Sequence, residues 1–140
     1  MELVRRVLTK LPAWIFSVVT VMAILWLTLA PQPLGEEPPP LFPGADKIAH
    51  GIMFGGLTVM FLLDWQRKHG WHRVVISRIF FFGGVSAIFG VLIEYAQAGM
   101  GLGRSLEYED MIADAAGAFL CALLWMFFQG IWILTERDRG

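Results

Sequence analysis

The chain has 140 residues, of which 56% are hydrophobic and 16% are charged, and its formal net charge is −1. Because soluble domains carry about 25% charged residues, this composition indicates a membrane protein. The single cysteine, Cys121, excludes an internal disulfide, and the few scattered basic residues argue against nucleic-acid binding. The sequence contains no CxxC pair, P-loop, GxGxxG or GxSxG motif.

The first apolar stretch, residues 12–30, has nineteen residues without a charge, close to the ~20 that cross a bilayer core. A cleaved signal peptide is the alternative, because Arg5, Arg6 and Lys10 precede the stretch. The stretch exceeds the roughly 7–15 apolar residues of a signal peptide, and Pro31 would follow the cut. We therefore predict a retained transmembrane helix.

Three further apolar stretches follow, separated by segments rich in proline, basic residues or glycine. The sequence predicts one all-α domain, residues 1–140, forming an integral membrane four-helix bundle. Its spans are about 12–30, 45–63, 79–98 and 110–134, and its connections are 31–44, 64–78 and 99–109.

Charge asymmetry predicts the orientation. If both termini and the 64–78 loop share one face, that face carries nine of the eleven Lys and Arg residues and four acids, a charge of +5. The opposite face carries eight acids and two bases, a charge of −6. The positive-inside rule then places both termini in the cytoplasm of a multi-pass protein of the bacterial inner membrane.

Polar residues cluster at the predicted outer ends of three spans. Charged side chains at bilayer depth are costly and usually face a bundle interior, so a shared site is the simplest hypothesis. Helical spacing puts Asp46 with His50, Asp110 with Asp114, and Glu94 with Gln97 on common faces. The full set is Asp46, Lys47, His50, Glu94, Gln97, Arg104, Asp110 and Asp114.

Small residues predict which helix faces pack. Gly83, Ala87 and Gly90 follow the same helical ridge as Glu94, and Gly51 with Gly55 forms a GxxxG pair. A further small pair, Ala113 and Gly117, lies in the last span. Such ridges allow close helix approach, so we expect Glu94 inside the bundle and a shallow polar pocket facing outward.

Each polar residue also has a purely structural interpretation. Asp46 and Asp110 can cap helix N-termini, and Lys47 can extend to the interface. His50, Glu94, Gln97 and Asp114 can form interhelical hydrogen bonds, which is the favoured interpretation for Gln97. Arg104, a lone guanidinium among acids, can bind a carboxylate or a phosphate.

The ordered set Asp46-Lys47-x-x-His50, Glu94-x-x-Gln97, Arg104-Ser105 and Asp110-x-x-x-Asp114-x-x-Gly117 resembles the VanZ-like family of small bacterial membrane proteins. Gly51 replaces an aromatic residue often found there, and Asp114 replaces a frequent Asn. The resemblance covers residues 46–117. It implies a cell-envelope role, because the founding member is linked to resistance against teicoplanin, a lipoglycopeptide antibiotic.

The first functional hypothesis is a site that recognises or acts on an anionic envelope lipid or precursor. Its catalytic candidates are His50, Glu94, Asp110 and Asp114, and its ligand-binding candidates are Lys47, Arg104, Asp46 and Gln97. The sequence does not decide whether this is an enzyme. Membrane lipids and a homo- or hetero-oligomer are the expected partners, and no cofactor or metal is assigned.

Two alternatives remain. In one, the polar network only locks helix packing in a module that binds a partner or itself. In the other, His50, Glu94, Asp110 and Asp114 bind a divalent cation.

Overall fold

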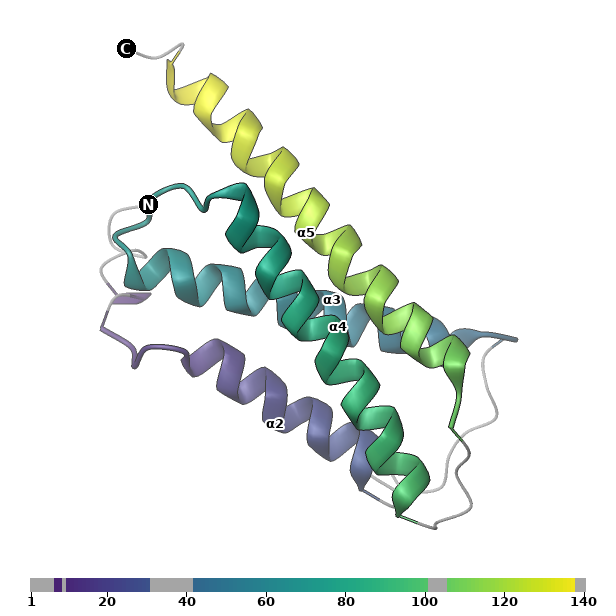
Figure 1. Cartoon of the computed structure of the whole chain (residues 1–140). Helices are drawn as coiled ribbons and strands as arrows, with labels where there is room; N and C mark the ends of the chain where they lie inside the picture. Colours follow the sequence, from purple (N-terminus) through teal and green to yellow (C-terminus); the bar gives the residue numbers. More distant parts are fainter. Residues whose placement is uncertain (1–6, 9, 31–41, 101–105, 138–140) are drawn as a thin grey trace.

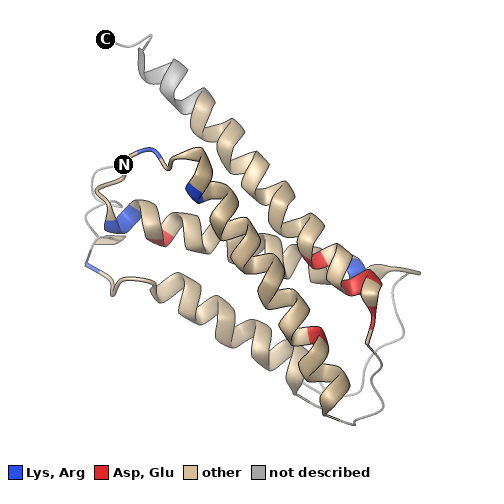
Figure 2. Ribbon diagram, in the orientation of Figure 1, with Lys and Arg blue, Asp and Glu red and all other residues tan. Residues whose placement is uncertain are grey.

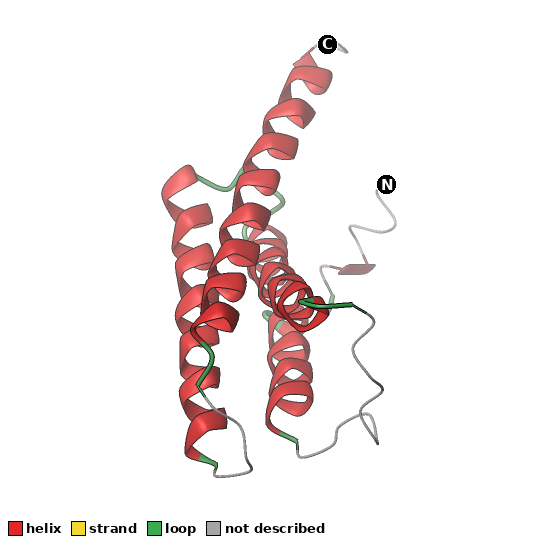
Figure 3. Ribbon diagram, turned by 90° about the vertical axis from the view of Figure 1, so that its right-hand side faces the viewer, coloured by secondary structure: helices red, strands yellow, loops and turns green. Residues whose placement is uncertain are grey.

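The computed structural model describes residues 7–8, 10–30, 42–100 and 106–137, with side chains described as far as Gly130. Within these ranges all regular structure is helical, as predicted. The four helices are α2 (Ile15–Leu29), α3 (Ala45–Lys68), α4 (Ile76–Gly99) and α5 (Tyr108–Arg137). Figure 1 shows them packed as one bundle, and the turned view of Figure 3 shows α4 and α5 side by side while α3 runs obliquely to them.

Three helices, α3, α4 and α5, are long and apolar enough to cross a membrane. Helix α2 is apolar but has only 15 residues. At 1.5 Å per residue it rises about 22 Å, less than the ~30 Å hydrocarbon core. The membrane-protein class therefore rests on α3, α4 and α5, and a full crossing by the first apolar stretch stays a prediction.

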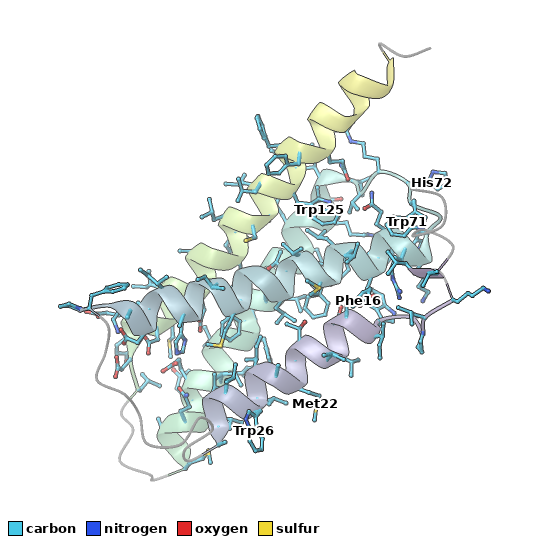
Figure 4. All side chains as sticks on the ribbon, turned by 180° about the vertical axis from the view of Figure 1, so that it is seen from behind. Phe16, Met22, Trp26, Trp71, His72 and Trp125 are labelled. Carbon is cyan, nitrogen blue, oxygen red and sulfur yellow. The ribbon has the colours of Figure 1, made fainter. Side chains whose placement is uncertain are left out.

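The surface of the bundle is apolar and part of its interior is polar, the reverse of a soluble protein. Ile52, Ile88, Ile112 and Phe128 are all more than 60% exposed. Figure 4 shows Met22 and Trp26 on the outer side of α2, where both are also exposed. Lipid is the solvent that suits these faces, because hydrocarbon accepts apolar side chains at no cost.

Two apolar clusters hold the helices together. At one end Leu62, Val74, Ile79, Phe82 and Ala122 pack from α3, α4, α5 and the α3–α4 connection. Toward the other end the buried members come from α2, α3 and α4: Ile24, Phe54, Leu57 and Ile93.

Close backbone contact joins α3 to α5. A Cβ added at Gly117 would collide with the backbone of Gly51, and one at Gly55 would lie 2.7 Å from the Sγ of Cys121. The sequence predicted packing through these small residues. Since glycine at these positions lets the helices touch, the start of α3 and the start of α5 lie beside each other.

The connection between α3 and α4 turns sharply at Gly70 and Trp71, which have φ angles of +71° and +63°. The side-chain amide of Gln129 then fixes this turn to α5. Its Nε2 donates to the carbonyl of Val74, and its Oε1 accepts from the Val74 N–H, each at 2.9 Å.

Candidate functional site

Acidic residues gather where α3 and α5 begin and α4 ends, and the ribbon of Figure 2 shows most of the Asp and Glu positions at that end of the bundle. Most Lys and Arg residues of the described chain lie at the opposite end. This is the separation of charge expected from the sequence. Six of the predicted site residues, from α3, α4 and α5, form one cluster: Asp46, Lys47, His50, Glu94, Asp110 and Asp114.

Lys47 is the centre of the outer layer of this cluster. Its Nζ lies 2.9 Å from Asp110 Oδ1, 3.0 Å from Asp46 Oδ2 and 3.2 Å from Glu107 Oε2. A fourth carboxylate, that of Glu109, is 3.5 Å away. The ammonium therefore joins the first turn of α3 to the first turn of α5 and the residue before it.

His50 is the centre of the inner layer, one helical turn deeper along α3. Its Nδ1 lies 3.0 Å from Asp114 Oδ1, a hydrogen-bond distance, and 3.9 Å from Glu94 Oε1. Its Nε2 lies 3.8 Å from Asp110 Oδ2. One imidazole thus faces carboxylates from two other helices.

The inner carboxylates are withdrawn from the surface. Asp114 is 0% exposed, Glu94 is 1% exposed and Asp110 is 8% exposed. Glu94 Oε2 accepts a long hydrogen bond of 3.4 Å from the Glu107 N–H, while Glu94 Oε1 and Asp114 Oδ2 have no hydrogen-bond partner within the described part of the chain. Buried carboxylate oxygens usually have such partners, so these two are unusual.

Gly90 makes space for Asp114. A Cβ at residue 90 would lie 2.5 Å from Asp114 Oδ2 and 2.7 Å from Asp114 Cβ. The predicted small-residue ridge of α4 is therefore a packed face, and it carries Glu94 into the bundle. Alanine at residue 90 would push the carboxylate away.

Among the described residues, Gln97 makes a hydrogen bond with α2 and not with His50 or Lys47. Its Nε2 donates to the carbonyl oxygen of Thr28 at 2.8 Å, which ties the end of α4 to the end of α2. This is an interhelical hydrogen bond of the kind favoured for Gln97 from sequence. Asp46 is an exposed partner of Lys47, and Arg104 lies outside the described residues.

Two surface hollows occur elsewhere on the described part of the chain. One lies between α2 and α3, beside Trp14, Val21 and Phe61, and the other lies beside Trp65 and Phe81. Neither of them lies at the polar cluster, where an outward pocket is expected.

Sequence reasoning missed a second buried polar group at the opposite end. Asp64 Oδ2 accepts hydrogen bonds from both the N–H and the Oγ of Ser17, each at 2.8 Å. Arg67 pairs with Asp64 at 3.2 Å and donates to the carbonyls of Leu8 and Pro12. Helix α3 continues to Lys68, so Asp64 and Arg67 lie inside the helix rather than in the connection predicted for residues 64–78.

The three-residue spacing of Asp64 and Arg67 is the feature of the sequence that could have predicted this ion pair. An Asp and an Arg three apart share a helix face and pair when the helix continues through them. The apolar stretch ends near residue 63, before the helix does, so its end alone does not mark the end of α3.

Glu107 was also missed as a site residue. It lies just before α5, and it contributes a carboxylate to Lys47 and a backbone N–H to Glu94.

The arrangement at the outer cluster suits proton transfer or cation binding. A His paired with an Asp beside a second buried acid is the geometry of a general base held in one tautomer. Two sets of three residues can each offer one ligand atom per residue, with the three atoms within 4.8 Å of one another. The sets are His50, Glu94 and Asp110, and Asp46, Glu107 and Asp110. Both sets have spacings that a metal ion can bridge after small movements.

Comparison with known proteins gives one match. No curated protein and no solved structure matches the chain. The VanZ/LLP1 family model matches residues 6–129, which include every described residue of the polar cluster. The chain therefore belongs to the VanZ/LLP1 family of membrane proteins.

Proposed function

We propose that this protein recognises or acts on the polar headgroup of an anionic lipid or lipid-linked precursor of the bacterial envelope, at the cluster around His50. One observation carries the proposal: His50 and Asp114 are paired at 3.0 Å beside the buried Glu94, at the ends of membrane-spanning helices. Residues at helix ends lie at headgroup depth. A titratable cluster of this kind inside a bundle is a functional-site hypothesis by default.

In this proposal the residues have separate roles. His50 and Glu94 accept or donate protons, and Asp114 orients the imidazole through Nδ1. Lys47 binds phosphate together with Arg104. Because Lys47 already contacts four carboxylates, phosphate must displace one of them or bind together with a further cation.

The proposed orientation determines which side of the membrane the cluster faces. With both termini in the cytoplasm of the inner membrane, the cluster faces the envelope side, where lipid-linked cell-wall precursors are used. A protein acting there alters susceptibility to lipoglycopeptides, the phenotype that the family resemblance implies.

A second candidate function is structural, and a specific observation favours it. Lys47, His50 and Gln97 each contact another helix or the segment preceding it. Such a network can lock a small module that assembles with itself or with a partner, with no ligand of its own.

Separate replacements distinguish the two functions. His50→Gln, Glu94→Gln and Asp114→Asn keep side-chain size, and Glu109→Gln is the matched control because Glu109 is 76% exposed in its side chain. Each variant is expressed in cells that lack the protein, and folded membrane protein is quantified beside lipoglycopeptide susceptibility. We expect the first three to lose the phenotype at wild-type levels of folded protein. Loss of phenotype only in proportion to folded protein supports the structural function.

Native mass spectrometry of the detergent-purified full chain tests the ligand directly. We expect an anionic lipid or polyprenyl-phosphate adduct that weakens in Lys47→Gln and His50→Gln but persists in Glu109→Gln. A wild-type protein without such an adduct contradicts lipid recognition.

A further inference from the structure

The inner layer of the polar cluster carries more negative than positive charge. Three carboxylates, those of Glu94, Asp110 and Asp114, surround a single imidazole, and Lys47 reaches only Asp110 among them. Burying ionised carboxylates without compensation is strongly unfavourable, and buried charges are normally paired or bound to a metal. The described residues therefore leave an anionic centre that a cation stabilises.

A second observation is independent of this charge. Glu94 is 1% exposed and its Oε1 has no hydrogen-bond partner among the described residues, yet that oxygen lies 3.9 Å from His50 Nδ1. The other oxygen of Glu94 accepts from the backbone of Glu107, so the carboxylate is held in this orientation. Buried carboxylate oxygens normally accept a hydrogen bond, so an oxygen that no described donor reaches is available to a cation.

We propose that His50, Glu94 and Asp110 form a binding site for a divalent transition-metal ion of the Zn²⁺ or Mn²⁺ class. One atom from each of the three residues can be chosen so that all lie within 4.8 Å of one another. Ligand atoms around a tetrahedral ion at about 2.1 Å are roughly 3.4 Å apart. The 3.8 Å between His50 Nε2 and Asp110 Oδ2 is already close to that spacing.

Asp114 has the position of an orienting residue in this site. Metal-binding histidines usually donate their second ring N–H to a carboxylate, which fixes the tautomer and the ring orientation. Asp114 Oδ1 lies 3.0 Å from His50 Nδ1, and in the tautomer in which Nδ1 donates to Asp114, Nε2 is available to the ion. Nε2 is also the ring nitrogen nearer to Asp110.

The ligand set selects the class of ion. Imidazole favours zinc and other transition metals, whereas carboxylates alone suit Mg²⁺ and Ca²⁺. One imidazole with two carboxylates therefore indicates a borderline ion. Three protein ligands leave at least one position for water or for an oxygen of a bound molecule. The metal site shares His50 and Glu94 with the proposed proton-transfer site, and with an ion bound these two residues act as ligands. Its formation requires only side chains of α3, α4 and α5 and no lipid.

Metal content and titration of the full chain test this site. Protein purified in detergent is stripped with a chelator, and Zn²⁺, Mn²⁺ and Mg²⁺ are each titrated by calorimetry, with bound metal measured by mass spectrometry. We expect about one Zn²⁺ or Mn²⁺ per chain and weaker binding of Mg²⁺. Co²⁺ in the same site should give visible absorption bands typical of nitrogen and oxygen ligands. Stripped wild-type protein that takes up no stoichiometric Zn²⁺ or Mn²⁺ overturns the proposal, whatever the variants do.

Variants locate the ion. Glu94→Gln and Asp110→Asn should each weaken Zn²⁺ binding by about 10–100-fold or more, the range for losing a supporting residue of a metal site. Glu109→Gln removes one carboxylate near Lys47 and no ligand, so it should bind as wild type does. Asp46→Asn tests the alternative set of Asp46, Glu107 and Asp110. Weakening in Asp46→Asn with unchanged binding in Glu94→Gln places the ion in that outer set and contradicts the proposal.

The result of the metal-binding test can be distinguished from the result of the lipid-adduct test of the proposed function. Stoichiometric metal with no lipid adduct retains the metal site and removes lipid recognition. A lipid adduct on protein that takes up no stoichiometric Zn²⁺ or Mn²⁺ retains lipid recognition and removes the metal site.

Discussion

The backbone of Gly51 in α3 lies directly against Gly117 of α5, with no room for a Cβ on Gly117. His50 precedes one of these residues and Asp114 lies one turn before the other, so the contact between the glycines brings the imidazole and the carboxylate to 3.0 Å. The polar cluster therefore depends on two residues that have no side chain.

Replacement of Gly117 tests this dependence. Gly117→Ala should force α3 and α5 apart and destabilise the protein by about 1–3 kcal/mol, the usual range for overpacking. The measurement is the midpoint of thermal unfolding in detergent. Gly56→Ala is the control, because no atom lies within 4 Å of a Cβ at residue 56, and it should be neutral or slightly stabilising. Equal midpoints for Gly117→Ala and wild type would contradict the close packing.

Asp64→Leu should be among the most destabilising single replacements outside the polar cluster. It leaves Arg67 buried without its carboxylate and removes the acceptor of both Ser17 hydrogen bonds. Breaking a buried pair by removing one partner costs about 3–5 kcal/mol. Urea or thermal unfolding should show the loss, while Lys68→Gln, at an exposed neighbouring position, should behave as wild type. A small loss of stability in Asp64→Leu would show that the contacts of Asp64 with Ser17 and Arg67 do not hold α2 in place.

The stability of the protein should depend more on the charge of the side chain at residue 97 than on its size. Gln97→Leu removes the hydrogen bond to the Thr28 carbonyl and should cost about 0.5–1.5 kcal/mol. Gln97→Glu keeps the shape but turns a second oxygen toward that carbonyl at neutral pH, so it should be less stable than Gln97→Leu. The comparison of thermal midpoints decides this order, and the reverse order would indicate that Gln97 does not donate to Thr28.

Lys47→Gln should produce a salt-dependent loss of stability. The variant leaves four carboxylates facing one another, and their repulsion is screened as ionic strength rises. The difference in thermal midpoint from wild type should therefore shrink between low and high salt. Adding Glu109→Gln to the variant should recover part of the loss. A salt-independent difference would mean that packing of the lysine stem dominates.

Cysteine labelling tests the predicted orientation. On a Cys121→Ser background, Glu109→Cys should react with an impermeant reagent added outside the cell, and Lys68→Cys should react only after the membrane is opened. Both positions are exposed in the structure. The opposite pattern would place the polar cluster on the cytoplasmic side.

The sequence predicted the helical membrane fold because apolar length and bilayer thickness are directly related. It also predicted the burial of Glu94, since Gly83 and Gly90 share its helical ridge and small residues mark packed faces. The Asp64–Arg67 pair escaped because the apolar stretch ends before α3 does.

Helix α2 is fastened at both ends by residues that come much later in the chain. Ser17 near its beginning binds Asp64, and the Thr28 carbonyl near its end binds Gln97. During synthesis neither bond can form until α3, and then α4, has left the ribosome. Helix α2 can therefore be fastened at both ends only after Gln97 has been made, when more than half of the 140 residues have been synthesised.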